Sequence, residues 1–154
     1  MYAYTPDAEA GRWETMATTG VVHPDAYEPA FAALDSKIFI FGGYVGKSQM
    51  TDALSTLSAD GRFERLVPDG QVPSSRAKHQ GFAYKNKFYF GGGKELRSDG
   101  GYELTNDFYK YDPRLNLFTR LSIRGKRMKP RRDFAIALLG DRVFIHCGWT
   151  STEV

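Results

Sequence analysis

The sequence predicts an all-β repeat protein built from four-stranded antiparallel units. One observation is an apolar stretch that ends in glycine and occurs three times. It stands at Lys37–Gly43, Lys87–Gly93 and Arg142–Gly148. A second is an aromatic residue that follows a turn, at Trp13, Phe63 and Phe118. Both markers recur after 50 residues and then after 55. Self-similarity at this period indicates stacked structural units such as blades.

The units follow one another in a fixed order. Residues 1–20 hold two short extended segments separated by a turn at Pro6–Asp7 and Gly11, so they supply strands three and four of a unit. Residues 30–67 form a complete unit, in which Lys37–Phe41 is a continuous apolar run of the kind that inner strands show. Asp60–Gly61 is a strong hairpin signal between its last two strands.

The same plan recurs in residues 76–122, with strands expected at 87–91, 107–111 and 117–121. Residues 131–154 then supply only strands one and two of a further unit. The twelve strands amount to three units, two of them complete and one divided between the two ends of the chain.

Composition fits this plan and narrows the protein class. Aromatic residues make up 14% of the chain and it has 16 glycines, which suits short strands and tight turns. The single Cys147 excludes an internal disulfide, and a net charge of +3 is too mild to indicate nucleic-acid binding. No apolar run approaches the ~20 residues of a membrane span. We expect a soluble protein of the cytoplasm or nucleus.

These residues resemble the kelch repeat, a four-stranded blade of a β-propeller. The double glycine is matched by Gly42–Gly43 and Gly92–Gly93, and the kelch tyrosine by Tyr109, with Leu54 in its place one unit earlier. Trp13 matches the kelch tryptophan, for which Phe63 and Phe118 substitute. Cys147 departs from the pattern at a first-glycine position. The resemblance implies an incomplete kelch-type propeller, with these aromatic residues in the apolar layers between blades.

Three blades are too few for a closed propeller, which has 4–8. The sequence therefore favours a piece of a longer chain. The alternative is that its open edges pair with another copy, in which case the isolated chain would associate with itself.

Basic residues are the candidate partner-binding groups. The resemblance places the arginine that opens each blade near the mouth of the central channel, where Arg76 matches it and Arg131 and Arg132 compete for the next position. Guanidinium groups bind carboxylates in a bidentate manner. The alternative is a salt bridge that ties one blade to the next.

Lys94, Arg97 and the run from Arg124 to Arg132 are the second candidate group. Six of the nine residues in this run are Lys or Arg. Such runs favour acidic partners, and the alternative is a solvated connection between blades.

The resemblance implies a protein-interaction scaffold for acidic or carboxylate-bearing peptides, and by family analogy a substrate-recruiting adaptor of a ubiquitin ligase. No catalytic residue, metal ligand or cofactor is predicted. The alternative is an enzyme related to the kelch-type copper oxidases or the nitrile-specifier proteins. The specifier motif fails at Tyr111, where it requires histidine.

Overall fold

The computed structural model describes residues 1–6, 10–21, 23–24 and 26–151. The predicted turn at Asp7 and the last three residues of the predicted final half-blade, 152–154, lie outside this part. Every regular element in the described ranges is a β-strand. None of the described residues forms a helix that could cross a membrane. The prediction of an all-β fold is confirmed.

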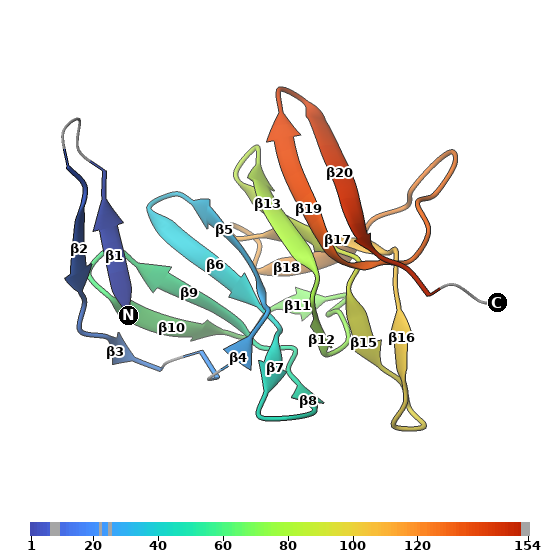
Figure 1. The fold of residues 1–154 in the computed structure, drawn as a ribbon, viewed down its shortest axis with the longest axis horizontal. Helices are drawn as coiled ribbons and strands as arrows, with labels where there is room; N and C mark the ends of the chain where they lie inside the picture. Colours follow the sequence, from blue (N-terminus) through green and yellow to red (C-terminus); the bar gives the residue numbers. More distant parts are fainter. Residues whose placement is uncertain (7–9, 22, 25, 152–154) are drawn as a thin grey trace.

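The strands form four main sheets that lie one after another along the chain (Figure 1). The N-terminal half-blade consists of β1 (Tyr2–Thr5) and β2 (Arg12–Thr15). The first blade consists of β5 (Ala30–Leu34), β6 (Lys37–Phe41), β9 (Leu54–Ser58) and β10 (Arg62–Leu66). The second blade consists of β13 (Gln80–Tyr84), β14 (Lys87–Gly91), β17 (Phe108–Asp112) and β18 (Leu117–Arg120). The C-terminal half-blade consists of β19 (Arg132–Leu139) and β20 (Arg142–Trp149).

The strands within each blade are antiparallel neighbours, as the sequence predicts. Each complete blade also has a fifth strand that the sequence analysis missed. The two-residue strands β3 (Thr19–Gly20) and β11 (Asp69–Gly70) pair in parallel with β10 and β18. Strands of two residues show no hydrophobic periodicity. The sequence analysis therefore could not distinguish them from the connections between blades in which they lie.

Two small sheets lie on one side of the blades, at the bottom of the view in Figure 1. One contains β4 (Ala26–Tyr27), β7 (Tyr44–Val45) and β8 (Gln49–Met50), and the other contains β12 (Arg76–Ala77), β15 (Lys94–Leu96) and β16 (Tyr102–Leu104). In each sheet the chain leaves the double glycine, forms a hairpin and pairs with the segment that opens the same blade. We call this side the mouth.

Aromatic side chains fill the layer between the two complete blades. Phe41 of the first blade stacks on Phe90 of the second at 4.5 Å between ring centroids and meets Phe118 edge-on at 5.5 Å. Phe39 meets Tyr111 at 5.8 Å. Aromatic pairs in these arrangements contribute about 0.5–1.5 kcal/mol each beyond the area they bury. This layer is the core of the described chain.

The double glycines combine a left-handed backbone with a close approach of the next segment. Gly42 and Gly43 have φ of 71° and 106°, and Gly92 and Gly93 have 63° and 92°. A Cβ on Gly42 would lie 2.5 Å from the carbonyl oxygen of Arg76. Glycine satisfies both conditions at little cost.

The three turn aromatics differ in their surroundings. Phe118 is 1% exposed, Phe63 is half-buried and Trp13 is 69% exposed. The expectation of an apolar layer holds for Phe118 and is wrong for Trp13 in this chain. Phe118 faces the preceding blade, whereas the N-terminal half-blade has no described blade before it.

Candidate functional site

The segments that open successive units are joined to one another along the mouth. Glu28, Lys78 and Asp133 occupy equivalent positions and all have left-handed φ, of 60°, 60° and 55°. The Lys78 N–H donates to the Glu28 carbonyl at 3.0 Å, and the Asp133 N–H donates to the Lys78 carbonyl at 3.1 Å. The Lys78 ammonium also lies 3.0 Å from the Glu28 carboxylate and 3.5 Å from that of Asp133. Burial alone lowers the pKa of Lys78, but these two carboxylates outweigh it and hold the pKa above its usual value.

Arg76 belongs to β12 of a mouth sheet, but its side chain is turned into the protein. Its side chain is fully buried. The guanidinium donates to Asp107 at 2.8 Å and to Glu95 at 2.9 Å, and it lies 5.1 Å from the centre of the Tyr109 ring. Burial raises the pKa of Asp107, but the hydrogen bond and charge of Arg76 outweigh this effect and the pKa lies below its usual value.

The predicted partner-binding role of Arg76 is therefore corrected to a structural one. The salt-bridge alternative is the closer description, with one difference. The ion pairs lie within a single blade, and the link to the preceding blade is made by the backbone, through the Gly43 N–H and the Arg76 carbonyl at 2.8 Å.

Arg131 holds the equivalent opening position in the C-terminal half-blade. Its carbonyl accepts the Gly93 N–H at 2.7 Å, just as that of Arg76 accepts Gly43. This match decides between Arg131 and Arg132, which the sequence left open. The Arg131 guanidinium donates to the carbonyl oxygens of Lys129 and Cys147, and no carboxylate of the described residues forms an ion pair with it.

Arg132 belongs to a row of cross-strand pairs that faces the mouth. The same backbone position pairs Tyr27 with Tyr44, Ala77 with Lys94, and Arg132 with Trp149. The tyrosine rings stack at 5.1 Å, and the Arg132 guanidinium lies 4.5 Å from the centre of the Trp149 ring. Equivalent positions thus carry an aromatic pair, a lone cation and a cation–aromatic pair. The backbone repeats while the surface chemistry changes from unit to unit.

Three of the predicted binding residues share one cleft of about 590 Å³ at this mouth. Lys94 comes from β15, Arg97 from the hairpin that follows it, and Arg132 from the start of β19. Tyr102 of β16 and Trp149 of β20 supply aromatic walls, and Glu103 of β16 adds one carboxylate to a lining that has three cations. We call the three cations and the two aromatic residues the basic cleft.

The cations of the basic cleft are only loosely held. The Lys94 ammonium lies 4.0 Å from the centre of the Tyr102 ring, and no carboxylate in the described ranges forms an ion pair with it. Arg97 pairs with Asp99 of its own hairpin at 2.8 Å, with both side chains about half exposed. Arg132 pairs with the adjacent Asp133. Exposed pairs contribute only about 0–1 kcal/mol, so an incoming carboxylate can replace them.

Sequence reasoning missed the two aromatic walls. A signal for Trp149 was present, because it directly follows Gly148 as Lys94 directly follows Gly93. Tyr102 had no such signal, since the hairpin that carries it differs in length from the one in the first blade. Most of the basic run from Arg124 to Arg132 is an exposed connection, which agrees with its solvated alternative.

The histidines at the blade junctions serve packing. His79 lies edge-on against Phe41 and Phe90, with ring centroids 5.9 and 5.5 Å apart, and burial lowers its pKa to about 3. The His23 ring bonds Ser55 Oγ and the Gly42 carbonyl, each at 3.0 Å. Burial lowers its pKa as well. Within the described ranges no three His, Cys, Asp or Glu side chains gather as a metal site.

Comparison with known proteins places these features in a family. The family model described as "KLHDC2/KLHL20/DRC7 Kelch-repeats domain" matches residues 1–151. Human Kelch domain-containing protein 2 is 29% identical over 91% of this chain and 40% of its own length. Mouse Kelch domain-containing protein 1 is 26% identical over 94% of the chain and 41% of its own. The Rho GTPase-activating protein gacHH of Dictyostelium discoideum is 31% identical over 77% of the chain and 8% of its own. The chain thus spans less than half the length of these relatives.

Proposed function

Because this chain belongs to the kelch-repeat family, we propose that it is a protein-interaction module whose basic cleft binds an acidic or carboxylate-bearing peptide segment. One observation carries the proposal. Lys94, Arg97 and Arg132 come from three separate elements of the second blade and the C-terminal half-blade, and they line the same cleft at the mouth.

The chemistry of the cleft suits a carboxylate beside an apolar or planar group. The two guanidinium groups can bind carboxylate oxygens in pairs, and the Lys94 ammonium adds a point charge. Trp149 and Tyr102 present flat surfaces on which peptide groups and side chains pack. Since the cleft is open to solvent, we expect binding to weaken as ionic strength rises.

A peptide array with free and amidated carboxyl ends tests the proposal and separates two carboxylate sources. Terminal carboxylates bind only in the free-acid series, whereas acidic side chains bind in both. We expect Lys94→Glu combined with Arg132→Glu to reduce affinity by roughly tenfold or more per lost contact. The matched control is Arg124→Glu with Lys126→Glu, which makes the same charge change on the exposed connection.

The outcome that contradicts the proposal is a peptide that binds equally well to the cleft variant and loses affinity in the control. Thermal melts of both variants should agree with that of the wild type, because the substituted side chains are not part of the core.

The proposal also covers the class and location of the protein. It treats the chain as a non-enzymatic scaffold of the cytoplasm or nucleus, with delivery of its partner to a ubiquitin ligase as the specialised role. Metal analysis with an oxidase assay tests the enzyme alternative. Co-purification of ligase subunits with the tagged full-length protein tests the adaptor role, and imaging the same protein tests its location.

A further inference from the structure

The C-terminal half-blade has an open edge at the position where a third strand belongs. In the second blade, β14 pairs on one side with β13 and on the other with β17. The corresponding strand β20 pairs with β19 alone among the described residues. An unpaired edge of this kind accepts a further strand.

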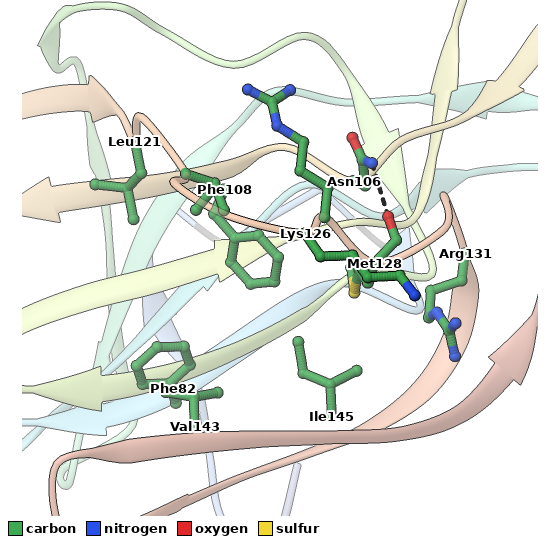
Figure 2. Close-up of a pocket in the computed structure, with 11 residues that line it drawn as sticks. Phe82, Asn106, Phe108, Leu121, Lys126, Met128, Arg131, Val143 and Ile145 are labelled. Atoms are coloured by element: carbon green, nitrogen blue, oxygen red, sulfur yellow. Dashed lines mark hydrogen bonds between the residues drawn. The ribbon is translucent and has the colours of Figure 1, made fainter.

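An apolar pocket of about 420 Å³ lies beside this open edge (Figure 2). Phe82 and Phe108 of the second blade line one side, and Val143 and Ile145 of β20 line the other. Asn106 holds the exposed connection over it by donating to the Met128 carbonyl at 2.8 Å.

The preceding junction shows what fills such a space. Between the first and second blades, strands three and four of the second blade contribute Tyr109, Tyr111 and Phe118 to the aromatic layer. Tyr111 and Phe118 are opposite each other across β17 and β18, with ring centroids 5.1 Å apart. Tyr109 lies beneath the guanidinium of the opening arginine, Arg76.

The N-terminal half-blade presents the same aromatic set to solvent. Tyr4 and Trp13 are opposite each other across β1 and β2, with ring centroids 4.9 Å apart, as Tyr111 and Phe118 are. Tyr2 then corresponds to Tyr109. Tyr2 is 75% exposed, Tyr4 is 49% exposed and Trp13 is 69% exposed. One end of the chain therefore carries the side chains that the other end lacks.

We propose that a second copy of this chain places its β1–β2 hairpin on the open edge of β20, with Tyr2, Tyr4 and Trp13 in the apolar pocket. The pairing of β14 with β17 sets the register, so Tyr4 lies opposite Val143 and Tyr2 opposite Ile145. Tyr2 then lies near Arg131, as Tyr109 lies near Arg76.

Two copies that exchange hairpins in this way form a closed ring. Each contributes two complete blades and two halves, so the pair holds six blades, within the 4–8 that propellers use. The other face of β20 is covered at the same time. Phe144 is exposed and occupies the position of Phe39, which packs against the following blade, so Phe144 packs against the exposed Ile38 of the second copy. Head-to-tail contacts of this type close when the rotation between copies completes a circle.

The area involved is adequate for a stable dimer. Each aromatic side chain buries about 150–250 Å², and three enter the pocket at each of two junctions. Part of each side chain is already buried in the single chain, and this area is subtracted. When the area lost by both partners at both junctions is added, the total is on the order of 1,200 Å² or more, at the lower bound of specific interfaces.

Cys147 weakens this junction through steric crowding. It occupies the first-glycine position with a left-handed φ of 59°. The equivalent Gly42 and Gly92 have no room for a Cβ against the next opening segment. Cys147→Gly removes this obstruction together with the only thiol, and we expect it to strengthen association.

Light scattering after size exclusion, over a dilution series of the 154-residue chain, measures the assembly. We expect twice the 17.3 kDa chain mass, and a shift to the monomer mass on Trp13→Ser or Tyr2→Ser. Both side chains are exposed in the single chain, so neither change disturbs its folding. Val67→Ser, which removes another exposed apolar side chain, is the matched control and should leave the dimer intact.

Disulfide capture tests the register. In the Cys147→Gly background, Ala3→Cys with Phe144→Cys places two thiols opposite each other, and mild oxidation should give a covalent dimer. Ala3→Cys with Ile145→Cys is displaced by one residue and should not, because the side chains then point to opposite faces. A monomer at every concentration overturns the proposal. Equal capture by both pairs overturns the register, and oligomers that lengthen with concentration overturn the closed ring.

Discussion

Replacing Arg76 by Met separates a structural arginine from a partner-binding one. Methionine keeps the apolar stem but removes every donor. Glu95, whose side chain is 20% exposed, loses its cation, and Asp107, at 10%, keeps only the exposed Arg120 guanidinium 3.6 Å away. Removing one partner of a buried ion pair costs about 3–5 kcal/mol. The lost contact with Tyr109 adds roughly 0.5–2 kcal/mol at most. Against a typical stability of about 5–15 kcal/mol, this loss is large.

Urea denaturation followed by far-ultraviolet circular dichroism gives the free energy of unfolding. The matched control is Arg131→Met, the same substitution at the equivalent position of the next unit. Arg131 donates to two backbone carbonyls and to no carboxylate, so we expect its loss to be about 1 kcal/mol. A third variant, Arg76→Met with Asp107→Asn, removes one of the two carboxylate charges that Arg76 binds and should recover part of the stability, on the order of 1–3 kcal/mol of coupling.

The pH dependence distinguishes the charge effect from a loss of packing. In the wild type the pKa of Asp107 is depressed, so its contribution is complete above the usual aspartate pKa of about 4 and is lost as pH falls through the lower value. In Arg76→Met, burial is opposed only by the exposed Arg120 and the Thr105 hydroxyl, so we expect this pKa to rise. The variant should therefore gain stability relative to the wild type as pH falls from 7 toward 4. If the difference in the free energy of unfolding between the wild type and Arg76→Met is small, or stays constant over this pH range, Arg76 does not act as the buried partner of these carboxylates.

Three further predictions concern the repeat positions. Gly93→Val should lower the free energy of unfolding by about 3 kcal/mol or more, measured by urea denaturation, because φ is 92° and a Cβ would lie 2.7 Å from the Ala77 carbonyl; an unchanged midpoint would contradict this. Cys147→Gly should raise it by about 0.5–1 kcal/mol in a monomeric background, because left-handed backbone favours glycine. Phe118→Ala should cost about 3–5 kcal/mol and Trp13→Ala less than about 0.5 kcal/mol in that background, and equal losses would mean that both rings are buried.

The fold could be predicted from the sequence because the apolar strands and the glycines that end them recur at a regular spacing. The strands predicted at residues 37–41 and 87–91 occur at those bounds, and the strand predicted at 107–111 is displaced by one residue. The double glycines marked strand ends because glycine accommodates both the positive φ and the close approach of the neighbouring opening segments. Position along the repeat therefore predicts backbone structure.

The site was only partly accessible, since its members are set by the surroundings of each repeat. Lys94, Arg97 and Arg132 were predicted as binding residues and lie in one cleft, but the cleft walls Trp149 and Tyr102 were not predicted. Cross-strand pairing at the mouth decides which side chains meet. Lys94 is placed by pairing with the two-residue strand β12, which has no pattern of its own, and Arg132 and Trp149 meet at the end of the β19–β20 hairpin.

Arg76 and Arg131 show why equivalent residues of a repeat protein need not share a role. Their backbones make the same hydrogen bond to the preceding double glycine. The environment of the guanidinium differs, because the carboxylates that hold Arg76 come from β15 and from the residue before β17. In the C-terminal half-blade the position equivalent to Glu95 is Thr150. Among the described residues, no third strand pairs with β20. The Arg131 guanidinium therefore donates only to carbonyl oxygens. It lies beside the apolar pocket, where a side chain equivalent to Tyr109 would be placed. A strand supplied from outside the half-blade decides whether that arginine is buried as a clamp.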